Sequence, residues 1–204
     1  MDYVPGNVYL EFYNPFNYKI MRKSIAFMSS FAFLFLLASC DGGGTLKTES
    51  ALGLYEVTMP DYMSKATDLN VDASMQFQNV FKETYLAIID EDKKDFVDAF
   101  RDLGEYDSSL STIGNYRKIQ IDYFSEGVNI LRMGEPKQLT INGMAAEQIE
   151  FGGRVTDVDY DIYYIMTFIE GREDLYMMMT WTLGDSANKY KTDFLAMAKS
   201  FNEI

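Results

Sequence analysis

The chain has 204 residues, one cysteine, no histidine and a formal net charge of −13. This length accommodates one domain and a short appendage. The absence of histidine excludes the Ser-His-Asp and Cys-His nucleophilic systems and the usual His-containing zinc sites. A single cysteine forms no internal disulfide. The acidic charge argues against a nucleic acid partner, because phosphate backbones bind basic surfaces. With 48% hydrophobic residues, the chain is too apolar to be disordered.

Residues 21–39 have the organisation of a secretory signal peptide. Arg22 and Lys23 form a basic region, an apolar run follows over 25–38, and small residues stand directly before Cys40. The apolar run is shorter than the roughly 20 residues that a membrane-spanning helix needs. The segment therefore predicts export rather than a stable membrane span.

The sequence Leu37-Ala38-Ser39-Cys40 resembles the lipobox of bacterial lipoproteins. In that family the cysteine thiol is acylated, the signal is cleaved before the cysteine, and the new amine is acylated too. The resemblance implies lipidation at Cys40 and a lipid bilayer of the bacterial cell envelope as partner, with the protein facing the periplasm or the cell surface. Acyl chains contribute about 0.8 kcal/mol per buried CH₂, so several of them anchor stably. The alternative is an ordinary signal peptide with a coincidental cysteine.

The segments before and after this signal, residues 1–20 and 40–204, are interpreted separately. Residues 1–20 are rich in aromatic residues, and no known targeting signal places such a segment before its basic region. We interpret them as a mis-annotated extension, with translation starting at Met21; the alternative is a long basic region. Either way, everything before Cys40 is expected to be absent from the mature protein. Residues 40–52 are polar and glycine-rich and predict a lipidated cysteine with a flexible tether. Residues 53–204 form one domain.

The first half of this domain predicts strands followed by helices. Alternating apolar residues indicate strands over 54–59, 73–80 and 83–89. Apolar residues at helical spacing predict one helix that begins at Asp90-Glu91-Asp92 and ends near Gly104, and a second over 110–125.

The second half predicts a meander closed by a helix. Strands over 138–141 and 144–156 are joined by Asn142-Gly143, a hairpin turn sequence, and Gly152-Gly153 indicates a bulge. Two more strands, over 159–170 and 175–183, precede a helix that Asp185 or Ser186 caps. Consecutive strands that are apolar on both faces predict an α+β fold, a three-layer α/β/α sandwich with a mostly antiparallel central sheet.

Three features resemble the PsbP-like sandwich superfamily. They are the first strand closing on Met59-Pro60, the long C-terminal meander, and the terminal helix ending Phe194-Leu195-Ala196-Met197-Ala198-Lys199-Ser200-Phe201. The resemblance covers roughly residues 54–203. Most members are adaptors or accessory binding proteins, so it implies a non-enzymatic module of an envelope complex with a protein partner. No short catalytic motif defines the family, so no catalytic, cofactor-binding or metal-binding residue is carried over.

Two acidic segments leave alternative functions open. Asp157-Val158-Asp159-Tyr160-Asp161 begins like a calcium loop, but Ile162 and Phe168 stand where an EF-hand has Gly and Glu. A strand start is the simpler interpretation, with a weak Ca²⁺ site as alternative. Acids at 90–92, 95 and 98 suit a helix N-terminus. The alternative interpretation is that these acids form the active site of a small carboxylate-dependent hydrolase. Such a site needs two buried acids with separated pKa values in one cleft.

Sulfur and aromatic side chains are expected mainly in the core. Met177-Met178-Met179 would suit Cu(I), but neighbouring side chains in a strand point to opposite faces and cannot converge on one ion. Trp181 is expected in the core rather than as a ligand platform. The tyrosines of the meander are also expected to be buried beneath helices, and the alternative is that they form an exposed binding surface. These tyrosines are Tyr160, Tyr163, Tyr164 and Tyr176. Gly152-Gly153-Arg154 is too short to indicate a phosphate site.

Overall fold

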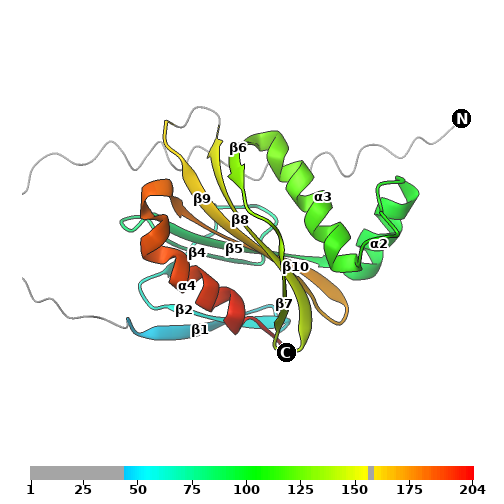
Figure 1. Ribbon diagram of the computed structural model, residues 1–204. Coiled ribbons are helices and arrows are strands. Elements are labelled where there is room, and N and C mark those ends of the chain that lie inside the picture. The colour runs from blue at the N-terminus through cyan, green and yellow to red at the C-terminus, as the bar shows by residue number, and fades with distance from the viewer. Residues whose placement is uncertain (1–43, 156–158) are drawn as a thin grey trace, which may run out of the picture.

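The computed structural model describes residues 44–155 and 159–204. A central sheet of eight strands runs through most of this part of the chain (Figure 1). Its strands, in spatial order, are β3 (Ser64–Lys65), β4 (Met75–Asn79), β5 (Thr84–Asp92), β10 (Asp174–Leu183), β9 (Ile162–Glu170), β8 (Met144–Val155) and β6 (Val128–Met133), with β7 (Lys137–Ile141) also paired to β8. Neighbouring strands pair antiparallel throughout this order.

Helices cover both faces of the central sheet, which confirms the predicted α/β/α sandwich (Figure 1). On one face lie α2 (Lys93–Asp102) and α3 (Thr112–Gly127). On the other lies α4 (Ala187–Ser200), together with a small sheet. That small sheet consists of β1 (Leu46–Ala51), β2 (Tyr55–Pro60) and β11 (Asn202–Glu203).

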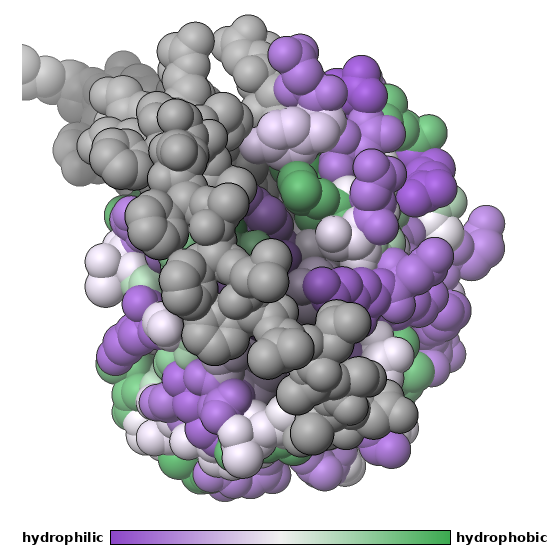
Figure 2. Space-filling view, turned by 90° about the vertical axis from the view of Figure 1, so that its left-hand side faces the viewer, coloured by the Kyte–Doolittle hydropathy of each residue, from purple (hydrophilic) through white to green (hydrophobic). Residues whose placement is uncertain are grey.

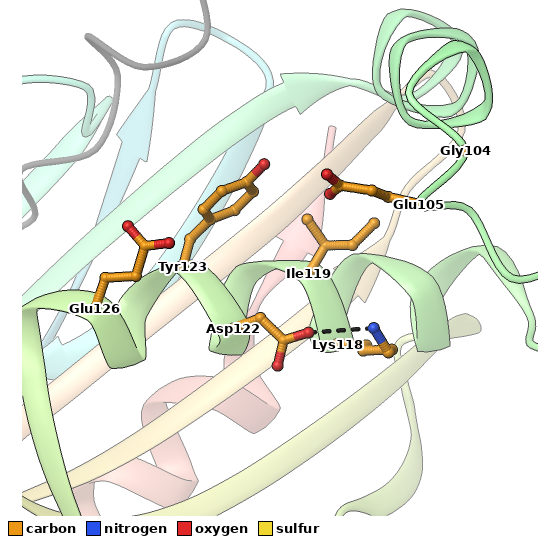
Figure 3. A pocket seen from close by; sticks show the side chains of 7 residues that line it. All are labelled: Gly104, Glu105, Lys118, Ile119, Asp122, Tyr123 and Glu126. Carbon is orange, nitrogen blue, oxygen red and sulfur yellow. Dashed lines mark hydrogen bonds and ion pairs between the residues drawn. The ribbon is translucent and has the colours of Figure 1, made fainter.

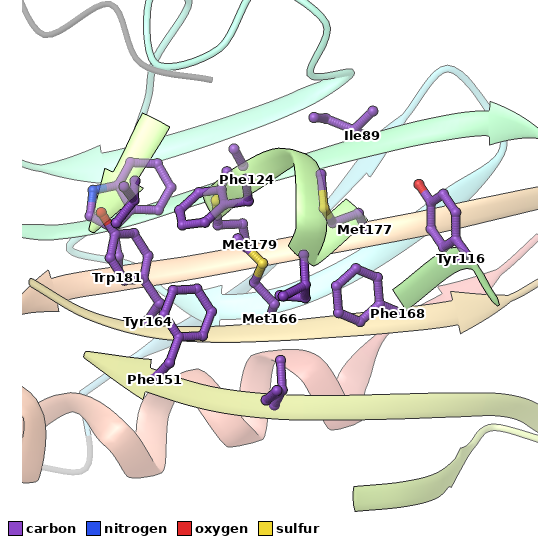
Figure 4. Close-up of a cluster of buried hydrophobic side chains, with 14 of the residues drawn as sticks. Ile89, Tyr116, Phe124, Phe151, Tyr164, Met166, Phe168, Met177, Met179 and Trp181 are labelled. Atoms are coloured by element: carbon purple, nitrogen blue, oxygen red, sulfur yellow. The ribbon is translucent and has the colours of Figure 1, made fainter. Parts of the chain in front are cut away.

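Alternation along the central strands divides the core into two clusters. In β10, Met177 and Met179 pack beneath α2 and α3, whereas Met178 packs toward α4. This confirms that the three methionines cannot converge on one ion. Figure 4 shows the first cluster, in which Trp181 is only 5% exposed and stacks on Tyr85 at 5.2 Å between ring centroids. The expected core position of Trp181 is therefore confirmed.

The ordered fold starts earlier than the sequence predicted. Residues 46–51 form strand β1 and pair with β2 over six residues, so the expectation of a flexible tether over 40–52 is wrong for this stretch. β1 has little apolar alternation because it is a half-exposed edge. Backbone pairing and contacts such as Lys47 Nζ over the Phe77 ring, at 4.8 Å, hold it instead.

One predicted helix start needs correction. β5 continues through Asp90 and Glu91, which pair with β10, and only Asp92 caps α2 by accepting a hydrogen bond from the Asp95 N–H at 2.8 Å. Sheet pairing overrides the local helix-start pattern there. α4 has the predicted residue Ser186 at its N-cap, after the short 3₁₀ helix η2 (Gly184–Ser186), although the Ser186 side chain makes no capping hydrogen bond.

The irregularity expected at Gly152-Gly153 lies in the opposite strand. β6, which the sequence analysis missed, pairs with β8, and its extra residue falls between Ile130 and Arg132. The glycines are needed because that strand approaches closely: a Cβ on Gly153 would lie 2.6 Å from Val128 Cγ1. The turn at Asn142-Gly143 is as predicted, with φ values of 47° and 87°.

Where Figure 2 shows described residues, this face of the molecule carries mostly hydrophilic residues, with smaller hydrophobic areas between them. Across residues 44–155 and 159–204, none of the helices combines the length and apolar character needed to cross a membrane.

Candidate functional site: a groove between α2 and α3

Some of the predicted site residues lie outside the part of the chain that the structure describes. Cys40 and Asp157 belong to this group, so neither lipidation nor a complete calcium loop is seen. Of the rest of that loop, Asp161 forms an ion pair with Arg154. Within the described ranges, no three His, Cys, Asp or Glu side chains are grouped so as to hold a metal ion.

The tyrosines of the meander do not form an exposed surface. Tyr163, Tyr164 and Tyr176 are at most 7% exposed, and Tyr160 is partly buried against the core beneath α3. Two of the buried hydroxyls have acceptors: Tyr163 donates to Glu150 Oε2 at 2.7 Å and Tyr176 to Glu203 Oε1 at 3.3 Å. The alternative of a tyrosine binding surface is therefore wrong for these three residues.

Two carboxylates with oppositely shifted pKa values lie on opposite faces of the central sheet. Burial raises the pKa of Glu91, whose Oε1 accepts hydrogen bonds from Tyr116 and Gln120 of α3. Burial also acts to raise the pKa of Glu150, but hydrogen bonds from Lys191 of α4, Tyr163 and Lys137 outweigh it and lower that pKa to about 2. Because the sheet separates them, they do not form the shared cleft that a carboxylate-dependent hydrolase requires.

Replacing Glu150 with glutamine should make stability less dependent on acid pH. The pKa of Glu150 is about 2 in the folded protein, below its ordinary value, so the stabilisation is complete above about pH 4.5 and is lost as pH falls toward 2. Its partners Lys137 and Lys191 are 62% and 40% exposed, and solvent screening reduces the expected loss in Glu150→Gln to about 1–2 kcal/mol at pH 6. Urea unfolding from pH 3 to pH 7 measures it, and a loss independent of pH would contradict this account.

A hollow lies between the end of α2 and one face of α3. The chain leaves α2 through a Schellman motif, in which the Glu105 N–H donates to Phe100 O at 2.9 Å and the Gly104 N–H to Arg101 O at 3.0 Å. Gly104 has φ of 74°, a conformation that favours glycine. This turn places Glu105 at the rim of the hollow, facing α3 (Figure 3).

The α3 side of the groove comes from one helix face. Its residues recur at spacings of three and four: Ile119, Asp122, Tyr123 and Glu126. With Gly104, Glu105 and Lys118 they enclose a volume of about 470 Å³, within the range of small-molecule and side-chain pockets. The Tyr123 ring packs against Phe100 of α2 at 6.2 Å between centroids, so the floor is aromatic and aliphatic.

The charge of the groove is negative. Lys118 Nζ lies 3.1 Å from Asp122 Oδ2, so this pair is neutral overall. Glu105 and Glu126 have no ion pair within the described part of the chain. The pKa of Tyr123 is raised by burial and then by these two carboxylates, including a hydrogen bond to Glu105. Two acids beside an aromatic ring suit a cationic group, which the carboxylates attract and the ring face contacts favourably.

Sequence reasoning missed this site. The sequence predicts a helix over 110–125, but its pattern assigns no binding role to Glu105, Asp122, Tyr123 or Glu126. The spacing of residues 119, 122, 123 and 126 could have indicated a second helix face with mixed aromatic and acidic character. The position of Glu105 could not be foreseen, because it depends on how the chain turns after α2.

Comparison with known proteins supports the fold. No family model and no curated protein matches the chain. Among solved structures, the cyanobacterial PsbP protein CyanoP from Synechocystis sp. PCC 6803 matches with a TM-score of 0.51 and 17% identity, covering 82% of this chain and 99% of that one. A protein of unknown function from Pseudomonas aeruginosa, PA94, described as a putative regulator, matches with a TM-score of 0.40 and 12% identity. This match covers 77% of this chain and 96% of that one. LpqN, involved in cell envelope biogenesis of Mycobacterium tuberculosis, matches with a TM-score of 0.46 and 8% identity, covering 80% of this chain and 86% of that one. The chain thus has a PsbP-like fold.

Proposed function

We propose that this chain is a lipoprotein of the bacterial cell envelope, a non-enzymatic accessory module that is anchored through Cys40 and binds a partner protein. The observation that carries the anchor is the sequence Leu37-Ala38-Ser39-Cys40 after a basic and an apolar segment. β1 starts at Leu46, six residues after that cysteine. A domain so close to its lipid would stay near the membrane surface.

The α2–α3 groove is the binding site that we assign to this module. Its three carboxylates face a single lysine, which is already paired with Asp122. A lysine or arginine side chain from a partner would place its charge between Glu105 and Glu126 and its aliphatic part over Tyr123. The strongly acidic chain as a whole would also attract a basic segment from a distance.

Binding of a basic peptide should depend on Glu105 and Glu126 of the groove. We expect tetralysine to bind the protein more tightly than tetraglutamate, and Glu105→Gln/Glu126→Gln to weaken tetralysine binding about tenfold, the effect of losing ~1.4 kcal/mol of charge interaction. Calorimetry at low salt measures this. Asp95→Asn/Glu135→Gln is the matched control, since it also removes two exposed acids, neither of which lines the groove. Equal losses in both variants would show that only net charge matters and would exclude the groove.

A further inference from the structure

The turn between β4 and β5 presents a phenylalanine entirely to solvent. Phe81 has a relative exposure of 101% and its neighbour Val80 is 37% exposed. The turn is held in place: the Lys82 N–H donates to Asn79 O at 3.2 Å and to Asn79 Oδ1 at 2.9 Å. Scattered exposed apolar residues are ordinary, but two consecutive ones at the tip of a braced hairpin form a small apolar projection.

This projection lies beside the place where the described chain begins. The Asp61 N–H donates to Thr45 O at 2.9 Å, and the next residue, Tyr62, accepts a hydrogen bond from Asn79 Nδ2 at 2.8 Å. Lys82 Nζ lies 4.8 Å from the centre of the Tyr62 ring. The start of β1 and the β4–β5 turn therefore belong to the same end of the molecule, the left-hand end in Figure 1 and the end that faces the viewer in Figure 2.

The length of chain before this point sets how far that end can be from a lipid anchor. Gly44 follows Cys40 by four residues, which span at most about 14 Å when fully extended. If Cys40 carries the acyl chains, Gly44 lies within that distance of the bilayer surface, and β1 starts two residues later. At this end of the domain the exposed apolar side chains are then Leu46 in β1 and the pair Val80 and Phe81 in the β4–β5 turn.

We propose that the β4–β5 turn docks on the lipid bilayer, with Val80 and Phe81 entering the interface between headgroups and acyl chains. This inference rests on the proposed anchoring at Cys40. The chain is strongly acidic, so docking by a broad face on anionic lipid would be repelled. A narrow apolar tip avoids that repulsion and suits zwitterionic lipid. The dock also leaves the α2–α3 groove accessible, because α2 lies at the opposite end of the molecule (Figure 1).

Tryptophan fluorescence of the lipidated full-length protein in phosphatidylcholine vesicles tests this dock. Phe81→Trp places a probe at the tip, and Val71→Trp places the same probe at a residue that is 89% exposed before the other end of β4. Trp181 is the chain's one native tryptophan and, being buried, gives both variants the same background. Brominated acyl chains quench only probes that enter the bilayer.

We expect brominated lipid to quench most of the added fluorescence of Phe81→Trp, with a blue-shifted emission, and to leave Val71→Trp unchanged. Equal, weak quenching of both variants in protein that carries acyl chains would overturn the dock while leaving the anchor intact. Absence of acyl chains on Cys40 would instead refute the proposed function. A blue shift that grows with protein concentration, without quenching, would mean that a second copy covers Phe81 and would also overturn the dock.

Discussion

Replacing Phe201 with alanine should lower the free energy of unfolding by about 3–5 kcal/mol, the range for deleting a fully buried phenylalanine. Phe201 has no solvent exposure. Its ring lies 5.0 Å from that of Tyr55 in β2 and 4.8 Å from that of Tyr176 in β10. It thus joins the end of α4 to both sheets, and its loss leaves a cavity among three elements.

Urea unfolding measures this loss, with Phe81→Ala as the matched control. The control removes the same atoms from a fully exposed side chain, so it should change stability by less than about 0.5 kcal/mol. A similar small change in Phe201→Ala would mean that the C-terminal segment does not pack on the sheets as described.

Arg117→Met should destabilise the protein by about 3–5 kcal/mol, because removing one partner of a buried ion pair strands the other. Arg117 Nε of α3 lies 2.5 Å from Glu147 Oε2 of β8, and the glutamate side chain is only 8% exposed. Methionine keeps the length of the arginine stem, so the effect isolates the charge. The pair also fixes α3, and with it one wall of the groove, on the sheet.

Two further variants separate this effect from a general one. Lys118→Met removes the neighbouring cation, whose partner Asp122 is 66% exposed, and should cost less than about 1 kcal/mol. The double variant Arg117→Met/Glu147→Leu should recover most of the stability, because no charge is left buried. If the double variant were as unstable as Arg117→Met alone, packing rather than charge would explain the loss.

Local patterns in the sequence were sufficient for most elements of the fold. The Asn142-Gly143 turn, the alternation of the methionines in β10 and the apolar stripe of α4 each depend on near neighbours in the chain, and each has the predicted form. Antiparallel order followed from these hairpins. The fold class could therefore be inferred without knowing any long-range contact.

Elements that depend on distant partners could not be predicted in this way. β1 and β6 lack a clear apolar alternation, because they lie at sheet edges and are held by pairing with β2 and β8. The sequence pattern predicts a helix start at Asp90 and Glu91. Backbone pairing with Tyr176 and Leu175 of β10 keeps both residues in β5 instead. The groove was missed for the same reason, since its two walls come from α2 and α3 and meet only in the folded protein.

Palmitate labelling of the full-length protein in bacterial cells tests the central proposal, anchoring through Cys40, most directly. The chain has no other cysteine, so Cys40→Ser removes the one attachment point for the thioether-linked lipid. We predict that the unaltered protein is labelled and recovered with membranes, whereas Cys40→Ser is unlabelled and recovered in the soluble fraction. Equal labelling of the two proteins, or no labelling of either, would contradict the account.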